Sequence, residues 1–176
     1  TYTYDNQNNL IELKDRKRNI TKLYYDTLGR KLKMQDPDMG EWMYEYDDIG
    51  NLIKQTDAKG QILEFEYDQL NRLVRKLSLR GTEGAEAISV QYIYDDITKE
   101  NCKGRLSKIT DQSGSTEFFY DRLGREIKSI KTVSSNTYQV TREYDVLDRL
   151  TKLTYPDSYI VNYSYDTNSG RLEKVD

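Results

Sequence analysis

Eight Tyr-Asp pairs recur along the 176-residue chain, and both side chains of a pair could take part in chemistry. Aspartate carboxylates bind calcium, and tyrosine rings line sugar-binding strips. Each pair is one tyrosine and the aspartate that follows it: Tyr4 and Asp5, Tyr25 and Asp26, Tyr46 and Asp47, Tyr67 and Asp68, Tyr94 and Asp95, Tyr120 and Asp121, Tyr144 and Asp145, Tyr165 and Asp166. The successive spacings are 21, 21, 21, 27, 26, 24 and 21 residues, which indicates a repeat architecture.

The spacing argues against a calcium site built from these aspartates. Calcium needs six to eight oxygen atoms that converge on one point. Successive turns on one edge of a β-sheet are two strand spacings apart, about 10 Å, which is too far for two aspartates to share an ion. We therefore interpret the aspartates as caps of turns, and we interpret the tyrosines as one face of a sheet with cross-strand stacking rather than as a sugar-binding strip.

Other catalytic and metal-binding chemistries have little support in the sequence. Histidine is absent, which excludes Ser-His-Asp and Cys-His nucleophilic systems and any imidazole metal site. The lone Cys102 is expected to be a partly buried small residue, since one thiol forms neither an internal disulfide nor a zinc site. No two of the 30 carboxylates stand out as a glycosidase pair. We predict a protein that is not an enzyme, with no catalytic residues, no cofactor and no metal.

Composition points to a thin, ordered structure. Only 36% of residues are hydrophobic, yet 16 are tyrosines, and disordered chains are poor in aromatic residues. A sheet with one apolar face fits these values better than a thick globule. The net charge is −3 with both signs interspersed, which argues against nucleic acid as a partner. No run of 18 apolar residues exists that would predict a membrane span.

The residues after each tyrosine predict a specific turn. Asp-x-x-Gly favours a type I turn in which the aspartate carboxylate accepts the backbone N–H two residues on. The fourth position then needs a positive φ and forms a G1 bulge. The residues there are of the three types that tolerate this backbone, namely Asn8, Gly29, Gly50, Asn71, Gly124 and Asp148. Gly104 and Gly170 complete the set of motif residues in the two remaining Tyr-Asp turns, which begin at Asp95 and Asp166.

Between these turns the sequence predicts β-strands. Runs of six to eight residues place aromatic residues two apart, as in Tyr44 and Tyr46, and therefore on one face of a strand. A second turn lies midway in each unit, as in "DPDMG" (36–40). The fold class predicted is all-β, a repetitive meander of antiparallel hairpins. Leu150 and Leu153 are three apart, so either a bulge separates them or both faces of the sheet are partly covered.

Three units are longer than 21 residues. The extra residues lie at "LRGTEGAEA" (79–87), at "DDITKENCKGRL" (95–106) and at "KTVSSNTYQ" (131–139). Insertions at strand ends are tolerated because the free energy of loop closure grows only with the logarithm of loop length. We expect these segments to lie on the surface.

The repeat resembles the RHS, or YD-repeat, family. The stretches that carry the resemblance include "YDTLGRKL", "YDRLGREI", "YDVLDRL" and "GRLSKITDQSG" (104–114), and it covers essentially the whole chain. Family members include shell components of insecticidal toxin complexes, bacterial polymorphic toxins and animal teneurins. The resemblance implies a sheet that winds spirally into a hollow cocoon, which in the toxins encloses a C-terminal toxic domain. The family's Asp-Pro-x-Gly self-cleavage signature is not matched, because "DPDMG" lies inside an ordinary repeat.

We therefore expect residues 1–176 to be a single array of about eight repeats, an internal segment of a larger shell that is secreted or at the cell surface. Its expected partners are the flanking repeats of the same parent chain and an enclosed effector domain, and exposed sheet edges favour edge-to-edge self-association. The alternative is a carbohydrate- or choline-binding surface module. Such modules use aromatic cages, whereas this chain has one tryptophan, Trp42, and its repeat is defined by Tyr-Asp and Gly-Arg.

Overall fold

The computed structural model describes residues 1–79 and 87–176. The insertion predicted at 79–87 therefore lies almost entirely outside the described residues. The chain divides into two compact units, Thr1–Val90 and Gln91–Asp176. Both consist of β-strands and turns, and the described residues include no helix. The prediction of an all-β meander is confirmed.

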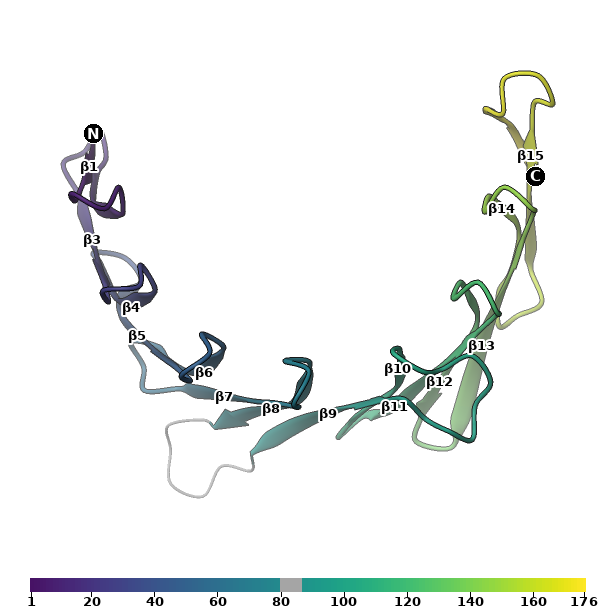
Figure 1. Cartoon of the computed structure of the whole chain (residues 1–176), viewed down its shortest axis with the longest axis horizontal. Helices are drawn as coiled ribbons and strands as arrows, with labels where there is room; N and C mark the ends of the chain where they lie inside the picture. Colours follow the sequence, from purple (N-terminus) through teal and green to yellow (C-terminus); the bar gives the residue numbers. More distant parts are fainter. Residues whose placement is uncertain (80–86) are drawn as a thin grey trace. The chain divides into compact units, whose positions relative to one another are not determined.

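In the first unit, each strand pairs antiparallel with the next strand along the chain (Figure 1). The strands are β1 (Tyr2–Tyr4), β2 (Leu10–Lys14), β3 (Ile20–Tyr25), β4 (Lys31–Asp36), β5 (Gly40–Tyr46), β6 (Leu52–Thr56), β7 (Ile62–Tyr67) and β8 (Leu73–Leu79). Every Tyr-Asp turn joins an odd strand to the even strand after it, and every midway turn joins an even strand to the next odd one. The two kinds of turn therefore lie at opposite ends of the strands. We call these two sides of the sheet the Tyr-Asp edge and the midway edge, as distinct from the hydrogen-bonding edges of the terminal strands.

The second unit repeats this arrangement. It includes most of β9 (Ile88–Tyr94) and all of β10 (Leu106–Asp111), β11 (Gly114–Tyr120), β12 (Glu126–Val133), β13 (Asn136–Tyr144), β14 (Leu150–Thr154), β15 (Ile160–Tyr165) and β16 (Leu172–Val175). Consecutive strands joined by short turns form local pairings, which is why a repeat of about 20 residues specifies the sheet so directly.

Aromatic residues two apart on a strand lie on one face of the sheet, as predicted. On β5, Trp42, Tyr44 and Tyr46 are half-buried, whereas Met43 and Glu45 between them are exposed. Among the described residues of each unit, no second sheet or helix covers this face. Among the described residues only Cys102 and Ser107 are fully buried, with 1% and 0% of their surface exposed. The low hydrophobic content of the sequence is therefore explained by a structure one sheet thick.

A β-bulge resolves the spacing of Leu150 and Leu153. Tyr144 pairs with Leu150, but Glu143 pairs with Lys152, so Thr151 is an extra residue in β14. The bulge places Leu150 and Leu153 on the same face. The same shift occurs beside the other Tyr-Asp turns of the described sheet, for example between Glu45 and Tyr46. The bulge is therefore a regular structural feature of each repeat.

The two other insertions are not simple surface loops. The extra residues of 131–139 lengthen β12 and β13, which are joined by a tight turn at Ser134 and Ser135. In the 95–106 segment, Cys102 is fully buried rather than partly buried as predicted. Lys99 of the same segment folds back onto the sheet, where its ammonium group lies 2.8 Å from the Glu117 carboxylate and 4.6 Å from the centre of the Phe119 ring. Residues 95–106 thus cover part of the neighbouring strands.

A search of the described residues for a helix long and apolar enough to cross a membrane found no candidate.

Candidate functional site

The Tyr-Asp turns form the most regular set of polar contacts in the molecule. In the turn at Asp26, carboxylate oxygen Oδ1 accepts the backbone N–H of Leu28 at 2.9 Å and that of Arg30 at 2.8 Å. The carbonyl of Asp26 accepts the N–H of Gly29 at 3.1 Å, and its own N–H donates to the Arg30 carbonyl at 2.9 Å. One aspartate thus accepts hydrogen bonds from the backbone N–H groups of Leu28, Gly29 and Arg30.

The other short turns share this geometry. The N–H two residues on donates to Oδ1 in the turns that begin at Asp5, Asp47, Asp68, Asp121 and Asp145. The predicted positive φ is confirmed at the fourth position, at Asn8, Gly29, Gly50, Asn71, Gly124 and Asp148. The bond from the N–H four residues on, which closes the far side of the turn, was not predicted.

Two Tyr-Asp turns are longer and close differently. Asp166 accepts the N–H groups of Asn168 and Ser169, and Gly170 takes the positive φ one position later than usual. Asp95 itself has a positive φ, and its carboxylate accepts the N–H of Gly104 from across the long insertion. The aspartate and the glycine keep their roles although the loop length changes.

An arginine follows four of the short turns, and it binds the aspartate of its own turn. The Arg30 guanidinium lies 2.6 Å from Asp26 Oδ2, and the corresponding distances at Arg72 and Arg149 are both 2.7 Å. Arg125 lies 2.6 Å from Asp121. The carboxylate therefore uses Oδ1 for the backbone of the turn and Oδ2 for the arginine, which holds the guanidinium in a fixed direction.

The same guanidinium reaches the next repeat. Arg30 Nη1 donates to the Asp47 carbonyl at 3.0 Å, and the group lies 5.2 Å from the centre of the Tyr46 ring. Arg125 makes the equivalent bond to the Asp145 carbonyl at 3.0 Å and lies 4.9 Å from the centre of the Tyr144 ring. A cation above a tyrosine ring within about 6 Å is attracted by the ring's electron density. Arg30 and Arg125 therefore each link two consecutive repeats.

The repeat tyrosines return a link in the opposite direction. Their hydroxyls donate to the carbonyl of the first residue of the strand after the previous Tyr-Asp turn, at distances of 2.7–3.0 Å. The pairs are Tyr46 and Lys31, Tyr67 and Leu52, Tyr120 and Leu106, Tyr144 and Glu126, and Tyr165 and Leu150. The predicted cross-strand ring stacking is replaced here by arginine over tyrosine, because the next tyrosine ring on this edge is a full repeat away.

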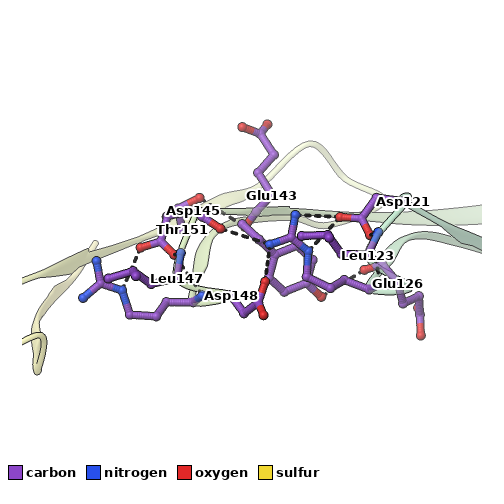
Figure 2. A network of polar contacts seen from close by, with 11 residues as sticks. Asp121, Leu123, Glu126, Glu143, Asp145, Leu147, Asp148 and Thr151 are labelled. Atoms are coloured by element: carbon purple, nitrogen blue, oxygen red, sulfur yellow. Dashed lines mark hydrogen bonds and ion pairs between the residues drawn. The ribbon is translucent and has the colours of Figure 1, made fainter.

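Figure 2 shows this network around Asp121, Asp145 and Asp148. Dashed lines run from the aspartate of one turn through a guanidinium to the next turn, where Arg125 also binds the Asp148 carboxylate at 2.7 Å. Asp148 is the residue with positive φ in that second turn. We call the aspartate, the arginine and the next tyrosine together the Asp-Arg-Tyr link.

Asparagine replaces the arginine in two repeats and makes a shorter contact. Asn51 Nδ2 donates to Asp47 Oδ2 at 2.9 Å and lies 3.3 Å from Asn71 Oδ1 in the next turn. Asn9 Nδ2 binds Asp5 Oδ2 in the same way, at 2.9 Å. The asparagine keeps the cap of its own turn, but it is too short to cover the next tyrosine ring.

The environment of the capping aspartates favours their ionised form. Partial burial alone would raise the pKa of Asp26, but hydrogen bonds from the Arg30 N–H, the Arg30 guanidinium and the Leu28 N–H outweigh it and lower the pKa. At Asp68 and Asp145 the largest effect is the backbone bond from the following arginine, which lowers the pKa of each carboxyl. Burial raises the pKa of Tyr46, Tyr67 and Tyr120, so these hydroxyls stay protonated as donors.

These contacts account for the motif residues as parts of turns and of links between repeats. Within the described ranges no group of three or more His, Cys, Asp or Glu side chains is arranged to hold a metal ion. Sequence reasoning missed the arginines Arg30, Arg72, Arg125 and Arg149 as partners of the aspartates. The signal was present, since an arginine or asparagine stands five residues after six of the eight tyrosines.

The chain matches one family model and shares its fold with several solved structures. The family model for the Teneurin YD-shell matches residues 1–107. No curated protein matches the sequence significantly. A solved TcdB2–TccC3–Cdc42 complex has the same fold, with a TM-score of 0.85 and 16% identity over 99% of this chain and 10% of the other.

Two further solved structures share the fold. The Photorhabdus luminescens Tc holotoxin pore gives a TM-score of 0.77 with 19% identity over 98% of this chain. TcdB2–TccC3 without its hypervariable C-terminal region gives 0.78 with 18% identity over 98%. In both cases this chain spans 10% of the matched chain. The family model covers more than half of the 176 residues, and the chain belongs to the Teneurin YD-shell family.

Proposed function

We propose that this chain is a non-catalytic wall segment of a secreted or cell-surface shell that encloses or presents an effector domain. The observation that carries the proposal is the Asp-Arg-Tyr link, because the most regular polar contacts of the molecule join one repeat to the next. Its membership of a shell family and the shared fold with parts of much longer chains support this role.

The link has the properties that a wall needs. It fixes the distance between consecutive Tyr-Asp turns through an ion pair, a hydrogen bond and a ring contact at once. It uses no thick hydrophobic core, so a sheet one layer thick keeps its register without a second layer. Flanking repeats of the same parent chain would extend this pattern, and the array of about eight repeats is then one stretch of a longer strip.

The hydrogen-bonding edges of the two terminal strands supply a test that needs only this chain. In the described sheet β1 pairs with β2 and β16 with β15, so each end strand has one hydrogen-bonding edge without a partner. Such edges template pairing with another chain. Analytical ultracentrifugation of the 176-residue chain should show concentration-dependent self-association. A stable species that stays monomeric at all concentrations would contradict the strip model.

Electron microscopy of the full-length parent protein tests the encapsulating role. A closed hollow particle with density inside is the expected result, and the segment 1–176 would lie in its wall. An open rod or ribbon would contradict encapsulation and would leave the repeats themselves as the functional surface.

A further inference from the structure

The third position of the short Tyr-Asp turns carries an exposed aliphatic side chain in five of six cases. These side chains are 64–73% exposed, and they belong to Leu28, Ile49, Leu70, Leu123 and Leu147. The turn uses only the backbone of this residue, whose N–H donates to the capping aspartate. Gln7 fills the same position in the sixth turn and makes the same bond at 2.9 Å. The turn therefore does not require an aliphatic side chain there.

The repetition is what makes these residues informative. A single exposed leucine needs no explanation, because folded proteins expose many apolar side chains. The same type of side chain at the same position of successive turns forms a row along the Tyr-Asp edge. Consecutive turns on this edge are two strand spacings apart, about 10 Å.

Each of the two compact units carries one such row. In the unit Thr1–Val90 we call Leu28, Ile49 and Leu70 the first aliphatic row. In the unit Gln91–Asp176 we call Leu123, Val146 and Leu147 the second aliphatic row, to which Val146 adds a side chain that is 96% exposed.

The two rows carry free charges of opposite sign. Asp48 precedes Ile49 in the first row, and Arg122 precedes Leu123 in the second. Both side chains are exposed, and neither forms a hydrogen bond or an ion pair with the residues that the structure describes. The corresponding positions of the other turns in the rows are uncharged, namely Thr27, Gln69 and Val146.

We propose that the first aliphatic row of one copy of this chain packs against the second aliphatic row of another copy. The aliphatic side chains interleave, and Asp48 of one copy forms an ion pair with Arg122 of the other. The spacing favours a repeat of the same kind as the partner, because a partner with another period would meet only one or two side chains that lie about 10 Å apart. Charge favours unlike rows, since two first rows would bring two Asp48 carboxylates together.

This interface is separate from the pairing of the β1 and β16 strand edges, which uses backbone hydrogen bonds. It joins unlike surfaces, so it is heterologous and can extend from copy to copy. Rows of a few side chains bury little area, and the association should therefore be weak and appear at high protein concentration. A lipid surface is a poorer match, because anionic headgroups would repel the Asp48 carboxylate.

Sedimentation velocity of the 176-residue chain over a range of concentrations tests the aliphatic contact. The variant replaces the first row by Leu28→Gln, Ile49→Gln and Leu70→Gln together, a change that the glutamine of the first Tyr-Asp turn shows to be compatible with the fold. The matched control is Met39→Gln with Met43→Gln, since these side chains are also exposed, at 54% and 47%, but lie outside both rows. Circular dichroism checks that each variant keeps the sheet.

Charge reversal tests which surfaces meet. Asp48→Arg and Arg122→Asp each place like charges across the contact and should weaken self-association about tenfold or more. The variant with both reversals should recover the association of the parent chain, because the two charges are merely exchanged. Recovery is expected only if Asp48 and Arg122 face each other.

The expected result is self-association that the glutamine variant and each single reversal weaken, that the double reversal restores and that the methionine control leaves unchanged. The proposal is overturned if the glutamine variant associates as strongly as the parent chain or if the double reversal restores nothing. Either outcome leaves the pairing of strand edges intact, whereas a chain that is monomeric at every concentration contradicts both. Co-sedimentation with phosphatidylserine-containing vesicles that the glutamine variant abolishes, without self-association sensitive to the variants, would also overturn the proposal.

Discussion

The two edges of the sheet hold their turns in different ways. On both edges an aspartate closes the turn that it begins, at Asp26 as at Asp57. Among the described residues, it is the Tyr-Asp edge that adds a charged side chain reaching from one turn to the next. On the midway edge close steric contacts occur between turns, and Gly40 lies so close to Ala58 that an added Cβ would be 2.5 Å from the Ala58 methyl group.

The difference separates two tasks that the repeat performs. Capping by aspartate makes a hairpin and needs only residues of the same turn. Linking needs a long side chain on one turn and an acceptor on the next, and it joins hairpins into a strip. The midway edge has one comparable polar contact in the described repeats, from the Thr21 hydroxyl to Asp36 at 2.6 Å. We therefore expect substitutions on the two edges to act through different physical causes.

The largest expected effect is steric and lies on the midway edge. In Gly114→Ala the new Cβ would overlap the backbone carbonyl of Thr132, and φ is +148° at this position. We expect the free energy of unfolding to fall by about 3 kcal/mol, from overpacking together with backbone strain. Urea titration followed by circular dichroism measures it. Gly50→Ala is the control, because its Cβ meets nothing within 4 Å and only the strain remains. Equal losses in both variants would refute the steric account.

The next largest effect is expected from Arg125→Ala on the Tyr-Asp edge. The variant loses the bonds to Asp121, to the Asp145 carbonyl and to Asp148 in one step. Arg75→Ala is the matched control, since the described contacts of Arg75 are an ion pair with the exposed Glu66 and a 3.3 Å hydrogen bond to the Ser89 hydroxyl. Urea midpoints should fall clearly for Arg125→Ala and less for Arg75→Ala. A drop of the same size in the two variants would mean that the link contributes no more than a surface ion pair.

Removal of one tyrosine hydroxyl should have a smaller effect. Tyr120→Phe leaves the Leu106 carbonyl without its 2.7 Å donor, and about 1 kcal/mol of unfolding free energy should be lost. Tyr24→Phe removes a hydroxyl that binds the Gln35 side chain on the exposed face, and its effect should stay within about 0.5 kcal/mol. The same chemical denaturation measures both, and a Tyr24→Phe loss as large as that of Tyr120→Phe would count against inter-repeat bonding.

The smallest effect per residue is the acid sensitivity of the caps. The pKa of Asp121 is lowered, because hydrogen bonds from the Arg125 N–H, the Arg125 guanidinium and the Leu123 N–H outweigh the effect of burial. A lowered pKa gives stability that is complete above the unfolded value of about 3.9 and is lost as pH falls through the folded value. Urea midpoints should therefore decline below about pH 4.

The control for this acid effect is Asp121→Asn, which already lacks the charge. Its stability should be lower at neutral pH and should depend less on acid than that of the parent chain. An identical pH profile for the variant and the parent would show that the cap at Asp121 is not a source of acid sensitivity.

The repeat explains why most of the fold was predictable from the sequence. Turn chemistry is local, so the aspartate and the residue of positive φ predict each hairpin. The alternation of side chains along a strand places aromatic residues that are two apart on one face. The bulge at Thr151 was left open because spacing alone does not show which strand carries an extra residue. The burial of Cys102 was missed because it depends on how the 95–106 segment folds over the sheet.

The links between repeats were less predictable for a related reason. Arg30 and Asp47 are 17 residues apart, and their contact depends on the sheet bringing consecutive turns side by side. The tyrosines signalled an aromatic face, but their hydroxyl acceptors are backbone carbonyls, which carry no sequence signature.

A double-mutant cycle between Arg125 and Tyr144 tests the central claim that the Asp-Arg-Tyr link joins consecutive repeats. Arg125→Ala, Tyr144→Leu and the double variant are compared by urea denaturation. The two residues belong to different repeats and meet through the guanidinium 4.9 Å from the ring centre. The account predicts that the two losses are not additive, because either substitution removes the shared contact. Strict additivity would contradict the link.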